Sequence, residues 1–200
     1  FRTADVVGLD TMCFVANTAY EKCTNDPERE TFKIPDYLQK MVDNEWLGQK
    51  SKQGFYKKID KGVIHSIDLD TLEYTPQNKK RYPGVRLAKE HFQLKDRLKA
   101  LVNSDDPAGE FVWEVTAKAL LYSANCLGEI ADDIVNIDRA MRWGFGWELG
   151  PFEAWDAIGL VESAERMKKE NKQIPKWVTE MLSTGNTSFY SRVEGFNCYW

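Results

Sequence analysis

Histidine is scarce in this sequence, and its cysteines form no cluster. The 200 residues include two isolated histidines, His65 and His91. No Ser/His/Asp or Cys/His catalytic set can be assembled from them, and a zinc site has almost no support. The four cysteines show no CxxC spacing, which favours free thiols in a reducing cytoplasm. The residues by themselves therefore predict no catalytic group and no metal site.

A basic excess and a long apolar run are also missing. The net charge of −4 argues against nucleic acid as a main partner, because phosphate-binding domains usually carry a clear basic excess. No apolar run approaches the ~18 residues of a membrane span, and no signal peptide is recognisable. The sequence therefore predicts a cytoplasmic protein without a membrane span. Its 42% hydrophobic content is sufficient for packed cores.

The sequence does contain an internal repeat. Three stretches match in the same order: 1–9 with 152–160, 34–42 with 174–182, and 55–62 with 189–195. Such ordered matches indicate a duplicated domain. The second copy has a long helical lead-in before Phe152 and the first has none before Phe1, so we expect the chain to be a fragment.

Helical patterns cover most of the chain. Helices are predicted over Asp10–Cys23, from Pro35 to a left-handed cap at Gly48, over Val85–Val102, over Ala108–Asp133, over Ile137–Trp143 with Asn136 as its cap, and from Pro151. The expected buried positions of two of these helices are Leu87, Phe92, Leu94, Leu98 and Leu101, and then Val112, Val115, Ala119, Tyr122 and Cys126.

The predicted fold class is all-α and duplicated, with a small β-hairpin at the end of each copy. In the first copy Phe55–Ile59 and Val63–Ile67 form the hairpin, and Gly62 supplies the positive φ of its turn. We expect residues 1–71 to be the second half of a first domain, 72–85 to be a linker, and 86–200 to be a second, complete domain.

Several charged and glycine-rich stretches have plain structural interpretations. Gly144-Phe145-Gly146 follows a helix instead of a strand, so it is a tight corner and not a phosphate loop. The acidic residues around it are expected to be helix caps and helix-end charges; they are Asp138, Glu148, Glu153 and Asp156.

Three segments carry a resemblance to a known family: 1–10 (FRTADVVGLD), 48–56 (GQKSKQGFY) and 138–159 (DRAMRWGFGWELGPFEAWDAIG). They resemble the C-terminal domain of L-3-hydroxyacyl-CoA dehydrogenases, which has the helical fold of the 6-phosphogluconate dehydrogenase C-terminal domain. Tandem copies are typical of bacterial multifunctional fatty-acid oxidation proteins, and the chain is similar to these.

The resemblance implies an activity that this chain does not complete. The family oxidises a 3-hydroxyacyl-CoA to a 3-oxoacyl-CoA in β-oxidation and passes hydride to NAD, with a histidine held by a glutamate as the base. That pair and the Gly-rich NAD loop belong to an N-terminal Rossmann domain, which is the expected partner. The isolated chain is therefore expected to be inactive. Helical domains of this family commonly pair, so a homodimer is a further expectation.

Two residues carry over from the family motifs. Lys50 matches a lysine that reaches the bound NAD, and Trp143 matches an aromatic residue that contacts substrate in some multifunctional relatives. Lys52 stands where a glycine is usual, and the second copy has no lysine over 183–189, so that copy is expected to be a structural partner.

The resemblance leaves alternatives open. Lys50 could be an ordinary solvated loop lysine. The chain could also be a stand-alone helical interaction or dimerisation module, or part of a dehydrogenase that acts on a non-CoA 3-hydroxy acid.

Overall fold

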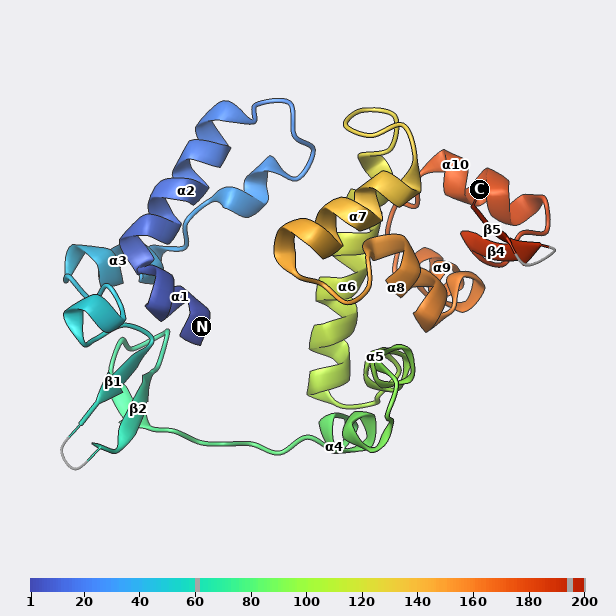
Figure 1. Cartoon of the computed structure of the whole chain (residues 1–200). Coiled ribbons are helices and arrows are strands. Elements are labelled where there is room, and N and C mark those ends of the chain that lie inside the picture. Colours follow the sequence, from blue (N-terminus) through green and yellow to red (C-terminus); the bar gives the residue numbers. More distant parts are fainter. Residues whose placement is uncertain (60–61, 194–195, 200) are drawn as a thin grey trace. The chain divides into compact units, whose positions relative to one another are not determined.

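The computed structural model describes residues 1–59, 62–193 and 196–199, with the backbone alone at 192, 193 and 196–198. In this part of the chain, helices predominate and are accompanied by two small antiparallel sheets. The residues form two compact units, Phe1–Lys80 and Arg81–Trp200, and each has its own apolar core. The coarse prediction of a mainly helical protein is confirmed (Figure 1).

The first unit combines helices with a three-stranded sheet. Its elements are α1 (Arg2–Val7), α2 (Leu9–Lys22), the 3₁₀ turn η1 (Arg29–Phe32), α3 (Asp36–Asp43), the 3₁₀ turn η2 (Gln49–Ser51), β1 (Tyr56–Lys58), β2 (Ile64–Ile67) and β3 (Tyr74–Pro76). Its buried core is Leu9, Cys13, Leu38, Met41, Phe55 and Ile67. In the sheet, β2 lies between β1 and β3, with Lys57 opposite His65 and Ser66 opposite Thr75.

The second unit is a larger helical body. Its elements are α4 (Pro83–Glu90), α5 (Leu94–Val102), α6 (Pro107–Asn125), α7 (Ile134–Phe145), α8 (Pro151–Ile158), α9 (Leu160–Lys169), α10 (Lys176–Ser183), β4 (Tyr190–Val193) and β5 (Phe196–Tyr199). Helix α8 packs against α5, α6, α7 and α9 (Figure 1). This position explains why Phe152 and Trp155 on α8 are completely buried.

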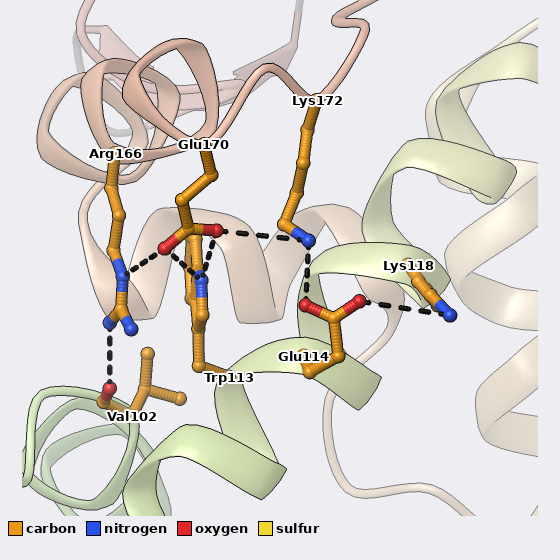
Figure 2. Close-up of polar contacts among 7 residues, drawn as sticks. All are labelled: Val102, Trp113, Glu114, Lys118, Arg166, Glu170 and Lys172. Carbon is orange, nitrogen blue, oxygen red and sulfur yellow. Dashed lines mark hydrogen bonds and ion pairs between the residues drawn. The ribbon is translucent and has the colours of Figure 1, made fainter.

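A polar network fastens the end of α9 to α5 and α6 (Figure 2). Glu170 accepts the indole N–H of the buried Trp113 at 2.8 Å and the Arg166 Nε at 2.9 Å. Arg166 also donates to the Val102 carbonyl oxygen at 3.1 Å, and Lys172 donates to Glu114 at 2.6 Å. The network satisfies a buried indole donor that would otherwise be costly.

Burial alone would raise the pKa of the Glu170 carboxyl, but the bonds from Trp113 and Arg166 outweigh it and hold that pKa below its usual value. The hydrogen bond from Lys172 likewise lowers the pKa of Glu114. Both carboxylates are therefore stabilised in the charged form that the network needs.

Several predicted helix boundaries were wrong. The helix from Pro35 ends at Asp43, and Gly48 opens η2 with a φ of 99° instead of capping that helix. Ala108–Asp133 is not one helix, because α6 ends at Asn125. The next helix begins at Ile134 and not at Ile137. Its cap is the Asp133 carboxylate, which accepts the Asn136 N–H, so Asn136 is not the cap.

The predicted helix Val85–Val102 is divided at His91, whose ψ of 133° is extended. The division interrupts the predicted apolar stripe, and Leu87 and Phe92 are exposed, the latter by 94%. The buried stripe of α6 also differs from the prediction: Val115 and Tyr122 are exposed, and the buried residues are Gly109, Trp113, Ala117, Leu120 and Ala124. Small residues at three of these five positions allow the close packing of α6.

The predicted linker 72–85 has structure at both ends. Tyr74–Pro76 pairs with β2, and α4 begins at Pro83. In the sequence, the boundary between the two units lies between Lys80 and Arg81. The predicted hairpin turns at 60–61 and 194–195 lie outside the described residues, whereas Gly62 has the positive φ, 84°, that the prediction requires.

Candidate functional site

An aspartate joins the first helix of each unit's repeated segment to the start of its terminal sheet. In the first unit Asp5 is 5% exposed. Its carboxylate accepts the backbone N–H of Phe55 at 2.8 Å and of Tyr56 at 3.0 Å. These bonds explain why a charged side chain is buried on α1: two donors that begin the strand satisfy it.

The loop before Phe55 approaches this aspartate so closely that side chains are excluded. A Cβ on Gly48 would lie 2.3 Å from the Asp5 carbonyl oxygen, and a Cβ on Gly54 would lie 2.2 Å from the Asp5 carboxylate. The loop is closed by the bond from the Gly48 N–H to the Gln53 carbonyl at 2.7 Å. Lys52, where the family motif has glycine, is left-handed with a φ of 61°, a conformation that glycine adopts without strain.

Lys50 lies on η2 in this loop, at the surface. Its ammonium contacts both carboxylate oxygens of Asp10, at 2.5 and 2.6 Å. The hydrogen bond from Lys50 lowers the pKa of the Asp10 carboxyl. About half of each side chain is exposed, 48% for Lys50 and 40% for Asp10. A cation held in this way keeps a defined position and remains accessible.

The first unit also has a cleft of about 530 Å³ next to Asp5. The lining residues are Arg2, Asp5, Gly48, Gln49, Lys52, Tyr56, Lys58 and Ile64. Lys50 is not among them, because its side chain is turned to Asp10. The loop 48–54 therefore presents two lysines in different surroundings, Lys50 beside Asp10 and Lys52 at the cleft.

The second unit repeats the aspartate arrangement. Asp156 on α8 accepts the N–H of Phe189 at 2.8 Å and of Tyr190 at 3.0 Å. The glycine that follows each helix is also similar, with a φ of 102° at Gly8 and 98° at Gly159. Burial raises the pKa of the Asp156 carboxyl, and the two amide bonds partly oppose that rise.

A further buried carboxylate, Asp138 on α7, lies beside this arrangement and is 2% exposed. It accepts the N–H groups of Phe152 and Glu153 at the start of α8, and the Tyr190 hydroxyl at 2.8 Å. Burial raises the pKa of Asp138, while burial and the neighbouring Asp138 raise that of Tyr190. The expectation that Asp138 serves a helix end agrees with these bonds, but its contact with the terminal sheet was missed.

A cleft of about 640 Å³ opens next to Asp138 and Asp156. Its charged lining residues are Lys95, Asp138, Arg139, Arg142, Glu153 and Asp156. Arg142 is paired with Glu153 at 3.1 Å, and Glu153 also accepts the Gly150 N–H that begins α8. The positive and negative side chains that are described in this second cleft are therefore equal in number.

Trp143 lies on the exposed side of α7 and is 77% exposed. The Arg139 guanidinium lies 5.7 Å from the centre of its ring, and Trp143 does not line the second cleft. Neither Trp143 nor Lys50 therefore lines either of these two clefts. The residues that shape the clefts are Asp5 and Asp156, and the signal that could have revealed them is their equivalent place in the repeat.

In the described ranges, no cluster of three or more His, Cys, Asp or Glu side chains is arranged to hold a metal ion. Over the same residues, no helix has the length and apolar character needed to cross a membrane.

Residues 1–58 match the family described as 3-hydroxyacyl-CoA dehydrogenase, C-terminal domain. The chain is similar to 3-hydroxyacyl-CoA dehydrogenases. The matched segment includes Asp5, Lys50 and Phe55, so the family resemblance predicted from the sequence is confirmed at the loop that carries Lys50.

Relatives extend this similarity over the whole chain. A probable 3-hydroxyacyl-CoA dehydrogenase of Bacillus subtilis (strain 168) is 50% identical over 200 residues, which are 100% of this chain and 25% of that protein. A putative fatty acid oxidation complex trifunctional enzyme of Rickettsia felis is 26% identical over 76% of this chain and 20% of its own length. The chain thus spans about a quarter or less of the relatives it matches. No solved structure matches it.

Proposed function

We propose that this chain serves as the C-terminal helical part of an NAD-dependent L-3-hydroxyacyl-CoA dehydrogenase of fatty-acid β-oxidation. The observation that carries the proposal is the match of residues 1–58 to the C-terminal domain of that family, together with the 50% identity of the whole chain to a probable 3-hydroxyacyl-CoA dehydrogenase. The catalytic histidine, its glutamate and the Rossmann fold would come from a separate N-terminal domain.

Within this function, Lys50 provides a cation for the NAD held by that domain. Its placement supports the role: the ammonium is at the surface, at the tip of a loop anchored through Asp5, and Asp10 orients it. The two carboxylate contacts leave a donor on the lysine for a ligand, since an ammonium has three. Trp143 is the proposed substrate contact, and its exposure leaves the ring accessible.

We further propose that the two units are copies of one domain, the first being the second half of its copy. The equal pairs of bonds at Asp5 and Asp156 and the similar φ of Gly8 and Gly159 support this origin. The second copy has no lysine over 183–189, so in this scheme it has a structural role and makes no cofactor contact of this kind. A homodimer through the helical units belongs to the same proposal.

The test uses a chimaera in which this chain replaces the matching quarter of the Bacillus relative. NADH oxidation with acetoacetyl-CoA is followed at the nicotinamide absorbance, for the chimaera and for the isolated chain. We expect activity from the chimaera and none from the chain alone. A folded chimaera without activity would contradict the proposed function and would favour an interaction module or another substrate; turnover by the isolated chain would contradict the assignment of the catalytic pair to another domain.

The roles of the two residues are then tested in the active chimaera. We expect Lys50→Ala to raise KM for NADH by about five- to tenfold, the size of a lost exposed charged contact, while KM for acetoacetyl-CoA stays the same. Trp143→Ala should raise KM for acetoacetyl-CoA and leave KM for NADH the same. Lys33→Ala, which removes another paired surface lysine of the first unit, is the matched control and should change neither value.

A further inference from the structure

We propose that the cleft lined by Arg2, Lys52 and Lys58 in the first unit, here called the basic cleft, binds a phosphate-bearing anion. The three cations come from separate segments: α1, the residue after η2, and the end of β1. They border one cavity of about 530 Å³. The site is distinct from Lys50, and the inference does not depend on the proposed function.

The charge balance of the basic cleft favours an anion. Its one carboxylate lining residue is Asp5, whose two oxygens already accept the N–H groups of Phe55 and Tyr56. Among the described residues, Arg2, Lys52 and Lys58 have no carboxylate within ion-pair distance, in contrast to Lys33 and Lys50 of the same unit. Three cations facing one satisfied carboxylate give the basic cleft a positive potential within an acidic chain.

The other lining groups suit an oxyanion with several acceptors. Gln49 also lines the cleft, and its side chain carries an amide NH₂ with two donors. The Arg2 guanidinium lies 5.5 Å from the centre of the Tyr56 ring, and this cation–π contact restricts the guanidinium near the cavity. A phosphate group, with its high charge and several acceptor oxygens, fits such a set of donors better than a single carboxylate does.

The second unit provides an internal comparison. In the repeat, Glu153 takes the place of Arg2 and Tyr190 that of Tyr56. Among the residues whose side chains the structure describes, the cleft beside Asp156 is lined by three cations and three carboxylates, and Arg142 is already paired with Glu153. The described lining of this second cleft is therefore neutral, and the anion preference is assigned to the first unit.

The phosphate group could belong to a free anion such as pyrophosphate or to a nucleotide-bearing molecule such as coenzyme A. The exposed lysines give contacts that salt weakens, because the Debye length at physiological ionic strength is about 8 Å. Binding should therefore be stronger at low salt, and it should remain measurable in ~0.15 M salt if the cleft acts as a site.

The test is a titration of the full chain with pyrophosphate, followed by backbone amide shifts in ¹H–¹⁵N spectra. We expect saturable shifts at Gln49, Lys52 and Tyr56. Lys52→Gly removes one cation and suits the left-handed backbone at this position, so it should keep the fold and weaken binding about fivefold. Lys58→Gln should have a similar effect, and a variant with both changes should lose saturable binding.

Lys57→Gln is the matched control. It removes a charge from the adjacent position of the same strand, but the Lys57 ammonium lies over the Tyr74 ring and Lys57 does not line the basic cleft. We expect pyrophosphate binding within twofold of the original chain, a change much smaller than that at Lys58. Equal weakening by Lys57→Gln and Lys58→Gln would overturn the site, since only the net charge of the unit would then matter.

Two further arms identify the source of the phosphate. If coenzyme A displaces pyrophosphate, and Lys52→Gly weakens the binding of both ligands equally, the result supports the site and assigns it to a nucleotide ligand. If pyrophosphate binds and coenzyme A does not displace it, the result supports a site for a free anion. Absence of saturable shifts at ~0.15 M salt overturns the proposal. Dehydrogenase activity of the chimaera is measured separately, so failure of either proposal leaves the other intact.

Discussion

The two units use the same carboxylate anchor in different surroundings. Asp5 and Asp156 each accept two successive backbone N–H groups, at 2.8 and 3.0 Å in both units. In the described part of the chain, the cations around Asp5 have no carboxylate partner except for Lys50, which Asp10 holds, whereas Asp156 lies near Asp138 and among equal numbers of positive and negative side chains. The connection between helix and sheet thus needs the aspartate and its two N–H donors. The charged side chains that line the neighbouring cleft can change without altering this connection.

The reason lies in where the polar groups are satisfied. A carboxylate that is withdrawn from water is tolerated because directed hydrogen bonds replace water, and both Asp5 and Asp156 receive two such bonds. Rim side chains reach solvent, where ion pairs contribute little to stability. They are therefore free to differ in charge and, with it, in the ligands they attract.

The largest expected effect tests the close approach of the loop to the anchor. Gly48→Ala should destabilise the first unit by about 3 kcal/mol or more, because its Cβ would collide with the Asp5 backbone at a φ of 99°. Gly185→Ala in the second unit has a similar φ of 90° but nothing within 4 Å, so about 1 kcal/mol is expected. Urea unfolding of the full chain measures the loss of unfolding free energy in both variants, and hydrogen exchange locates the affected unit. Equal losses would show that the positive φ alone is responsible and that the close contact with Asp5 contributes nothing.

A smaller effect tests the equivalence of the anchors. Asp5→Asn and Asp156→Asn should each cost about 2 kcal/mol in their own unit, because the amide NH₂ faces one of two N–H donors and leaves it unsatisfied. Asp132→Asn, at an exposed position of the second unit, is the control and should be near neutral. Hydrogen exchange of the peptides that contain Phe55 and Phe189 reports each anchor separately. If only one of the two variants lost stability in its own unit, Asp5 and Asp156 would not be equivalent anchors.

The polar network of Figure 2 should distinguish the units by their response to pH. Glu170→Gln is expected to cost the second unit about 1–2 kcal/mol at pH 7 by weakening the bonds to Trp113 and Arg166. Since the folded pKa of Glu170 is lowered, its contribution is present above the unfolded value of 4.5 and is lost as the pH falls through the lower folded pKa.

Unfolding of the wild type and Glu170→Gln between pH 7 and 3 checks this window. Asp10→Asn, which breaks the exposed pair with Lys50, is the matched change in the first unit and should leave stability unchanged at pH 7. A difference between wild type and Glu170→Gln that stays constant down to pH 3 would exclude ionisation of Glu170 as its source.

The smallest expected effect concerns the left-handed residues. Lys52→Gly should stabilise the first unit by about 0.5 kcal/mol, because its φ of 61° strains a lysine but not a glycine. Asn171→Gly in the second unit, at a φ of 57°, should give less, since asparagine tolerates this conformation better. Thermal unfolding of both variants measures the difference, and an equal or larger gain at Asn171 would contradict the explanation.

Sequence patterns predicted the helical class and many element starts because these depend on neighbouring residues. Pro151 begins α8 as expected, and the glycines before it form the corner that joins α7 to α8. Patterns failed where packing partners decide. The buried stripe of α6 differs from the predicted one, and Phe92 is exposed because the chain breaks at His91.

The sequence by itself determined the mainly helical fold, the position of the Lys50 loop and the resemblance to 3-hydroxyacyl-CoA dehydrogenases, because each is encoded in residues close together in the chain. Only the tertiary structure decided that Asp5 and Asp156 anchor the terminal sheets, and that Arg2, Lys52 and Lys58 border one cleft. Asp5 is 50 positions from Phe55 and Arg2 is 56 positions from Lys58 in the chain. Burial and charge balance arise only when folding brings such residues together.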